Sequence, residues 1–376
     1  MIPFNKPYLH GKELVYIAQA VTTGKISGDG VFTKKCHDFF EQRYGFKKVL
    51  MTTSCTDALE MAAILLDIQI GDEVIAPSYT FVSTVNAFAL RGAKIVFADS
   101  LPDHPNIDPV NIARLITSKT KAIVVVHYAG VACDMDTIMA IANQNNIPVV
   151  EDAAQAIDSY YKGKPLGSIG TFGTFSFHET KNIISGEGGL LAINDEKYIH
   201  RAEIIREKGT NRSSFFRGEV AKYGWVDIGS SFLPSDIIAA YLFAQLENID
   251  KIQTRRNAIW QRYYDKLSIV LANTGIELPI VADYSTNNAH MFYLVCENLE
   301  QRTALIQHLK DNCVHAVFHY LSLHSSEFYQ DKHAGDALPK SDHFTDTLVR
   351  LPLFYELTDE QVDHICLQIK QFVESK

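Results

Sequence analysis

Residues 53–56 read Thr-Ser-Cys-Thr and lie between a short apolar segment (48–52) and a helical pattern (56–67). Small residues at the start of a helix leave backbone N–H groups free, and these groups bind anions, phosphate above all. A Ser or Thr at this place is more often a simple N-cap, whose hydroxyl accepts a hydrogen bond from the helix. The segment therefore indicates either a phosphate site or an ordinary helix cap.

Asp152 stands directly after an apolar run, in Glu-Asp-Ala-Ala-Gln (151–155). If that run is a buried strand of a parallel sheet, Asp152 emerges at its carboxyl end, where such sheets bind ligands. A carboxylate at that edge favours a cationic partner. The alternative is a surface or capping acid at the end of a strand.

Lys181 lies in Thr-Phe-Ser-Phe-His-Glu-Thr-Lys-Asn (174–182), shortly before the glycine-rich segment 185–189. Most lysines are solvated surface charges. A lysine between an apolar strand and a glycine-rich turn can instead be partly buried, which lowers its pKa and makes the amine a nucleophile.

The three segments together supply the contacts that pyridoxal phosphate (PLP) requires. The cradle at 53–56 suits the phosphate, Asp152 suits the protonated ring nitrogen, and Lys181 suits the bond to the cofactor aldehyde. No one of the three is decisive alone. Their combination predicts a PLP enzyme.

Short β-branched runs alternate with helical patterns from about residue 47 to 195, and these elements must position the three segments. Near-continuous apolar runs are typical of strands buried on both faces of a mainly parallel sheet. Strands are predicted at 48–52, 72–77, 93–99, 121–130 and 147–154, with helices at 56–67, 108–117 and 134–145. The predicted architecture is an α/β sheet covered by helices on both sides.

After residue 194 the pattern changes to a charged helix (196–209), a Gly/Ser/aromatic segment (225–236) and a long helical pattern through about 272. The remainder predicts strands at 291–296 and 315–319 and helices near 300–311 and 358–373. We therefore expect a large α/β domain over residues 1–250 and a smaller α+β domain over residues 251–376.

Composition excludes several classes of function. The 376 residues carry 35 Lys and Arg against 44 Asp and Glu, a net charge of −9, which argues against a nucleic-acid or anionic-membrane partner. No apolar run reaches the roughly 20 residues of a spanning helix, and no signal-peptide pattern opens the chain, so a cytoplasmic location is expected. The six cysteines form no C-x-x-C pair, His-Glu-Thr-Lys lacks the second histidine of a zinc motif, and Gly-Glu-Gly-Gly is not a dinucleotide fingerprint. We expect no metal site.

The ordered motifs resemble the DegT/DnrJ/EryC/StrS family of sugar aminotransferases, which have the fold-type I PLP architecture. The resemblance runs from Gly-Asp-Gly (28–30) through 77–84, 126–130, 151–155 and 176–182 to Leu-Pro-Leu-Phe (351–354). It implies that Lys181 is the catalytic lysine and that Asp152 pairs with the ring nitrogen. It further implies a set of other cofactor contacts, namely Gln155 on the ring hydroxyl, Phe81 on the ring face, Cys55, Thr56 and Ser176 at the phosphate, and Ser231 at the phosphate of a neighbouring subunit. Phe81 could equally be a core residue.

The segment His-Tyr-Leu-Ser-Leu-His (319–324) matches a family segment that contacts the sugar nucleotide, with Ser322 in place of the usual proline. His319, Tyr320 and His324 are therefore substrate-side candidates.

Long matches at 59–68, 127–140 and 206–213 point to family members that transfer an amine from L-glutamate to C4 of TDP-4-keto-6-deoxyglucose. The resemblance implies a homodimer with shared active sites, a 2-oxoglutarate by-product, and the product TDP-4-amino-4,6-dideoxygalactose, a precursor for lipopolysaccharide or surface polysaccharide. The alternatives are a 3-aminotransferase, a sugar 3-dehydratase, whose members carry histidine in place of Lys181, and a regulatory member that binds PLP without turnover.

Overall fold

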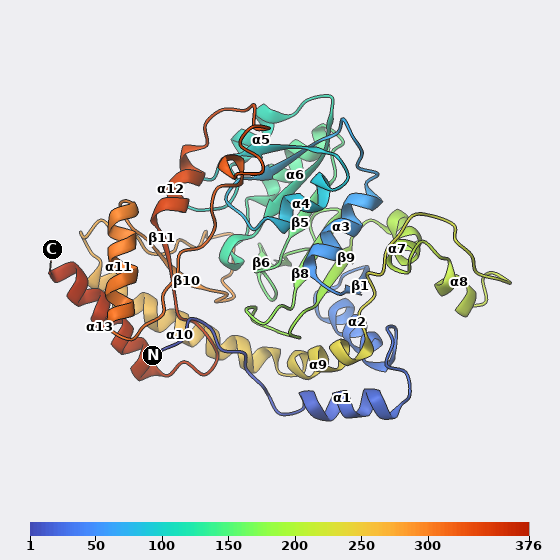
Figure 1. Ribbon diagram of the computed structural model, residues 1–376, viewed down its shortest axis with the longest axis horizontal. Helices are drawn as coiled ribbons and strands as arrows, with labels where there is room; N and C mark the ends of the chain where they lie inside the picture. Colours follow the sequence, from blue (N-terminus) through green and yellow to red (C-terminus); the bar gives the residue numbers. More distant parts are fainter. Residues whose placement is uncertain (376) are drawn as a thin grey trace.

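The apolar segments between residues 48 and 193 form one seven-stranded sheet in the computed structural model, which describes residues 1–375 (Figure 1). Its strands are β1 (Lys48–Thr52), β2 (Glu73–Pro77), β3 (Lys94–Ala98), β4 (Thr120–Val126), β5 (Val149–Asp152), β8 (Phe172–Ser176) and β9 (Gly189–Ile193). Each predicted strand of this region is present, although β4 ends four residues earlier than expected, before the 3₁₀ turn η1 (Tyr128–Gly130).

The spatial order of the strands is β1-β9-β8-β5-β4-β2-β3. Pairing is parallel from β8 through β5, β4 and β2 to β3, whereas β9 runs antiparallel to both of its neighbours. The mainly parallel sheet expected from the sequence is confirmed. Its consequence is that β1, β2, β4, β5 and β8 all present their carboxyl ends at one edge, where a ligand can meet residues from several strands.

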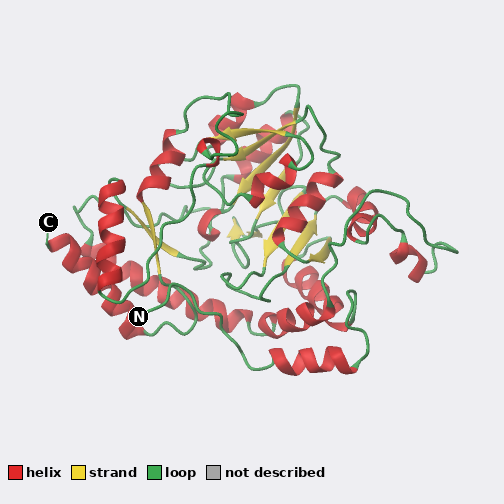
Figure 2. Cartoon of the chain, in the orientation of Figure 1, coloured by secondary structure: helices red, strands yellow, loops and turns green. Residues whose placement is uncertain are grey.

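Alternation along the strands divides the buried side chains between two helical layers, drawn around the sheet in Figure 2. Val49, Met51 and Ile123 face one core, packed against α1 (Glu13–Thr22), α2 (Val31–Tyr44), α5 (Pro109–Leu115), α6 (Met135–Gln144) and α9 (Asp236–Leu246). Leu50 and Val124 face the other, packed against α3 (Cys55–Leu65), α4 (Ser83–Ala89) and α7 (Ile199–Arg206).

The C-terminal part has its own core around the two-stranded sheet of β10 (Phe292–Val295) and β11 (Leu348–Leu351). Helices α10 (Ile249–Val270), α11 (Leu299–Asp311), α12 (Pro339–Thr347) and α13 (Asp359–Glu374) accompany it. Ile2 from the chain start joins this region through a bridge to Val314. The long helical pattern is interrupted at Asn248, between α9 and α10, and the domain division at residue 250 remains a prediction.

The strand predicted at 315–319 is wrong, because this segment makes only one bridge, from Val317 to Arg350. Val317 N–H donates to the Arg350 carbonyl at 3.1 Å, and Arg350 N–H donates to the Val317 carbonyl at 2.7 Å. The chain then departs from β11. The apolar residues there contact the C-terminal core without extending its sheet.

Residues 207–231, which we call the arm, project from the large domain and include α8 (Arg212–Phe216), as Figure 1 shows. Bridges join Glu207 to Ser231 and Thr210 to Trp225 and hold its two sides together. Trp225 is 82% exposed and Phe216 is 70% exposed. Aromatic side chains in such numbers on a projecting segment are typical of a protein contact.

The remaining short elements are β6 (Tyr160–Tyr161), β7 (Lys164–Pro165), η2 (Glu196–Tyr198) and η3 (Leu323–Ser325). Among residues 1–375, no helix combines the length and the apolar character needed to cross a bilayer.

The carboxylate of Asp236 joins α9 to the start of α2. It is buried and accepts hydrogen bonds from the backbone N–H groups of Phe32 and Thr33 at 3.2 and 2.8 Å, and from the Thr33 hydroxyl at 2.8 Å. Asp236→Ala should lower the free energy of unfolding by about 2 kcal/mol or more, because buried donors lose their acceptor. Asp236→Asn keeps one acceptor oxygen and should lose less. Urea denaturation of both variants measures this, and an unchanged midpoint for Asp236→Ala would contradict it.

Candidate active site

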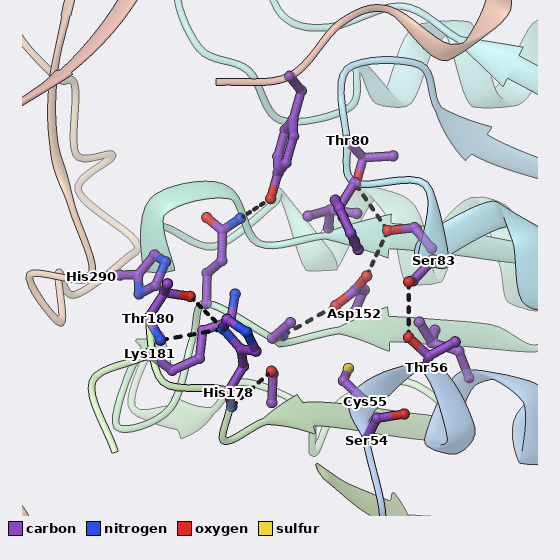
Figure 3. Close-up of a pocket in the computed structure, with 18 of the residues that line it drawn as sticks. Ser54, Cys55, Thr56, Thr80, Ser83, Asp152, His178, Thr180, Lys181 and His290 are labelled. Carbon is purple, nitrogen blue, oxygen red and sulfur yellow. Dashed lines mark hydrogen bonds between the residues drawn. The ribbon is translucent and has the colours of Figure 1, made fainter. Parts of the chain in front are cut away.

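A cavity of about 500 Å³ opens at the carboxyl edge of the large sheet. Its walls include residues from the start of α3, the end of β5 and the turn that carries Lys181 (Figure 3). The end of β8 and Arg350 of β11 also line it. The cavity brings together nine of the candidates named from the sequence, namely Cys55, Thr56, Phe81, Asp152, Gln155, Ser176, Lys181, His319 and Tyr320.

Helix α3 begins at the cavity wall, directly after β1. The Ser54 hydroxyl accepts a hydrogen bond from Asp57 N–H at 3.1 Å, so the helix-cap interpretation is confirmed. The first N–H groups of a helix have no intrahelical acceptor, and those of Cys55 and Thr56 therefore stay free to bind an anion. Gly189 of β9 lies against this turn so closely that a Cβ would fall 2.3 Å from the Ser54 carbonyl carbon. The segment can therefore be a helix cap and still leave N–H groups free for a phosphate.

Asp152 ends β5 and its side chain is buried. One carboxylate oxygen accepts from the Thr84 hydroxyl at 2.7 Å and the other from Ala154 N–H at 3.1 Å. Burial raises the pKa of Asp152, and these hydrogen bonds together with the charge of Lys181 partly oppose that rise. A buried carboxylate of this kind gains most from a cationic hydrogen-bond donor, and no described side chain fills that role by direct contact.

Lys181 lies in the connection between β8 and β9, and its backbone N–H donates to the His178 carbonyl at 2.9 Å. Burial lowers the pKa of its amine to about 8, while the charge of Asp152 acts in the opposite direction. Figure 3 shows Lys181 across the cavity from Ser54, Cys55 and Thr56, with Asp152 between them. The amine is therefore neutral in a large fraction of molecules near pH 8, the form that reacts as a nucleophile.

Asn182 fixes the position of the Lys181 turn. Its side-chain amide donates to the Gln253 side chain at 2.9 Å and to the Asn288 carbonyl at 2.8 Å, and its oxygen pairs with His290 Nδ1 at 2.9 Å. Since the Asn182 oxygen is the acceptor, His290 carries its proton on Nδ1 and presents an Nε2 lone pair. Burial, together with the charge of Lys181, lowers the pKa of His290 well below its usual range and keeps the ring neutral.

Gln155 and Phe81 border the cavity in different ways. The Gln155 side-chain oxygen accepts from Ala129 N–H at 2.7 Å, and its amide donates to the Tyr320 hydroxyl at 3.0 Å. Phe81 is 56% exposed at the edge of the cavity, so the alternative that it is a core residue is wrong. Ser176 ends β8 at the cavity wall, where its hydroxyl is within 3.4 Å of His178 N–H.

Two of the sequence candidates lie away from this cavity. His324 is buried, with Nδ1 2.8 Å from the Ser78 hydroxyl. Ser231 lies exposed at the base of the arm, paired by backbone with Glu207. His319 does line the cavity, and its Nδ1 is 2.7 Å from the Tyr128 hydroxyl. Among residues 1–375 no group of three or more His, Cys, Asp or Glu side chains is arranged to hold a metal ion.

The model of the DegT/DnrJ/EryC1/StrS aminotransferase family matches residues 7–370. The chain belongs to this aminotransferase family. Solved structures agree over the full length. TlmJ, an aminotransferase from Streptoalloteichus hindustanus, is 28% identical at a TM-score of 0.92, covering 100% of this chain and 99% of that one.

Two further solved structures are also similar to this chain. The PMP form of Spr1654 from Streptococcus pneumoniae is 27% identical at a TM-score of 0.92, with 100% of both chains covered. DesV from S. venezuelae, solved in complex with a ketimine intermediate, is 27% identical at a TM-score of 0.90, with 99% of this chain and 98% of that chain covered.

Three side chains of this aminotransferase site escaped the sequence argument, namely Thr84, His290 and Arg350. Thr84 holds Asp152, and His290 and Arg350 line the cavity from the C-terminal part of the chain. Their signals were weak, because a threonine in a helix, a histidine before a strand and an arginine within a strand are common everywhere. Only their convergence on one cavity distinguishes them.

The lowered pKa predicts how the reactivity of the Lys181 amine in this aminotransferase depends on pH. In protein without a bound ligand, an amine-directed reagent should modify Lys181 with a rate that rises through a midpoint near pH 8, because only the neutral amine reacts. Lys162, an exposed lysine whose pKa its hydrogen bond to Asp136 raises, is the matched control and should need a higher pH. Peptide mass spectrometry measures both, and equal midpoints would contradict the assignment.

Proposed function

We propose that this chain is a PLP-dependent aminotransferase that transfers an amino group from L-glutamate to a nucleotide-linked 4-keto-6-deoxy sugar. The observation that carries the proposal is the convergence of the buried amine of Lys181, the buried carboxylate of Asp152 and the free N–H groups of α3 on one cavity. Family membership and the PLP and PMP forms of Spr1654 support the same cofactor.

The residues of the cavity fit PLP. The N–H groups of Cys55 and Thr56 and the Ser176 hydroxyl would hold its phosphate at the positive end of α3. Asp152, which lacks a cationic partner among the described side chains, would accept a hydrogen bond from the protonated ring nitrogen. Gln155 would contact the ring hydroxyl, and Phe81 would cover one ring face.

When bound, PLP supplies an electron sink for the negative charge left on a substrate carbon after a proton departs. Lys181 would move that proton, because its amine is buried and its pKa is lowered to about 8. Asp152 would favour the protonated form of the ring nitrogen. Thr84 holds Asp152 in place by a hydrogen bond, and Asn182 holds the turn that carries Lys181. Neither side chain would take part in bond breaking.

We propose TDP-4-keto-6-deoxyglucose as the acceptor and TDP-4-amino-4,6-dideoxygalactose as the product, on the strength of the sequence matches at 59–68 and 127–140. His319 and Tyr320, on the cavity wall, are the proposed sugar-side contacts. Ser322 stands where the family usually has proline, and its hydroxyl and N–H pair with Thr345 at 2.9 Å each. These hydrogen bonds restrain the segment that a proline ring would otherwise stiffen.

Product analysis tests this function directly. With TDP-4-keto-6-deoxyglucose and L-glutamate, the enzyme should form 2-oxoglutarate and a single C4 epimer, because Lys181 delivers the proton from one face of a fixed sugar. The expected amine is axial, as NMR of the product would establish. Lys181→Ala should form no product. An equatorial amine or an amine at C3 would refute the proposed product, and absence of turnover would favour a binding-only role.

We also propose a homodimer in which the arm contributes Ser231 to the active site of a second copy. The exposed aromatic residues of the arm and the position of Ser231 outside its own cavity support this arrangement. A cytoplasmic location remains a prediction.

Hybrid dimers test the shared site. Co-expressed Lys181→Ala and Ser231→Arg chains should regain activity that neither homodimer has, because one of the two sites in each hybrid keeps both residues intact. Lys181→Ala with Asp152→Asn is the matched control. Both of these residues lie in the same chain's cavity, so that pair should stay inactive. A fully active monomer in light scattering would contradict the proposal.

A further inference from the structure

Arg350 of β11 lines the active-site cavity, yet its guanidinium has no counter-ion. Among residues 1–375, no carboxylate lies within ion-pair distance of it and no side-chain or backbone acceptor takes a hydrogen bond from it. Its Nε is buried without a partner. The side chain otherwise lies 4.6 Å from the centre of the Phe4 ring.

The described surroundings of Arg350 contain tyrosine hydroxyls but no carboxylate partner. Burial lowers the pKa of the guanidinium, and the nearby Tyr128, Tyr320 and Tyr79 oppose that shift. The hydroxyls of Tyr79 and Tyr293 are themselves buried without hydrogen-bond partners, and Tyr293 lies directly opposite Arg350 in the β10–β11 register. Burying a cation beside unpaired hydroxyls costs free energy that an anion in the cavity would offset.

The buried arginines Arg206 and Arg256 differ from Arg350 in this respect. Arg256, for example, donates to the backbone carbonyls of Ala289 and His290 at 3.1 and 2.8 Å. Arg206 donates to the Met51 carbonyl and pairs with Asp29 at 2.8 Å. The Nε atoms of Arg91 and Arg302 are also buried without a partner, but of these three arginines Arg350 is the one that lines the cavity. Its guanidinium is therefore placed to meet a ligand.

Two features of the cavity decide which anion fits. The free N–H groups of α3 already suit a phosphate on the side of the large sheet, whereas β11 lies outside that sheet, beside the C-terminal helices (Figure 1). A planar guanidinium matches a carboxylate through two parallel hydrogen bonds. The cavity also holds Lys181, so an amino acid whose carboxylate reached Arg350 would present its amine and its reacting carbon in the same space.

We propose that Arg350 binds a carboxylate of the amino-acid donor. This inference rests on the proposed function and names its donor-specificity residue. The same wall accepts a neutral sugar in the other half of the reaction, when Arg350 has no carboxylate partner. Donor and acceptor thus use one cavity but depend differently on this guanidinium.

The donor half-reaction, followed alone, tests the proposal. Holoenzyme is mixed with L-glutamate in the absence of sugar, and the change in cofactor absorbance is recorded against glutamate concentration. Arg350→Gln should raise the half-saturating concentration roughly 30-fold or more, the usual effect of removing one partner of a buried charge pair. The aminated enzyme should still react with the keto-sugar nucleotide at its wild-type concentration dependence.

Two amide donors distinguish the carboxylates of glutamate. L-Glutamine lacks the side-chain carboxylate and L-isoglutamine lacks the α-carboxylate. The amide that reacts poorly with the wild type but loses this disadvantage in Arg350→Gln identifies the group that Arg350 binds. Glutarate, which has neither amine nor keto group, should bind the wild type in calorimetry and lose affinity in the variant.

Arg302→Gln is the matched control, because its Nε is also buried without a partner but it does not line the cavity. It should leave both half-reactions unchanged. If Arg350→Gln does not fold, Arg350→Lys decides: it retains charge but loses the two-pronged contact, so its glutamate requirement should still rise.

Three outcomes overturn the proposal. The first is a half-saturating glutamate concentration in Arg350→Gln that equals the wild-type value, and the second is the same result in a folded Arg350→Lys. The third is a defect only in the reaction with the sugar nucleotide, which would assign Arg350 to the diphosphate of that substrate. If instead the wild type shows no absorbance change with glutamate and forms no product, the proposed function itself fails.

Discussion

Burial of two opposite charges in one cavity is the constraint on which the rest of the site depends. Removing Asp152 and Lys181 from water raises the pKa of the carboxyl and lowers that of the amine, so each becomes easier to neutralise. Both shifts cost free energy, and the surrounding fold must hold the groups in place against it. That requirement explains why so many neighbouring hydrogen bonds converge on the two residues and on the segments that carry them.

The carboxyl edge of the sheet supplies this rigidity. Behind Asp152, the buried Glu151 side chain accepts N–H groups of Gly167, Ile169 and Gly170 at 2.8, 2.7 and 2.5 Å and pairs with His127 at 2.9 Å. These bonds tie the ends of β4 and β5 to the loop that enters β8. Because β8 leads into the Lys181 turn, the same network that orders Asp152 also orders the start of the lysine-bearing segment.

The two ends of the cavity differ in chemistry. On the large-sheet side, the N–H groups of α3 suit an anionic part of a ligand, and the Asp152 carboxylate suits a cationic part of the same ligand. On the side of β11, the guanidinium of Arg350 offers only donors. Under the proposed function, such a division would let one cavity hold a cofactor at a fixed place while an anionic amino-acid donor and the neutral sugar ring of the nucleotide substrate alternate beside it. The arm would then add contacts from a second copy.

The sequence alone determined the mainly parallel α/β sheet, because apolar runs of strand length separated by helical patterns have few other stable arrangements. It also singled out Lys181, Asp152 and the start of α3 as candidates, since Asp152 ends an apolar run, the start of α3 precedes a helical pattern and Lys181 precedes a glycine-rich turn. Tertiary structure decided what local pattern cannot encode. It showed that 315–319 makes only one bridge, that Phe81 is exposed, that His324 lies against Ser78, and that Arg350 and His290 reach the cavity. Those facts depend on which distant segments meet, and the burial of a single side chain is set by that meeting rather than by its neighbours in sequence.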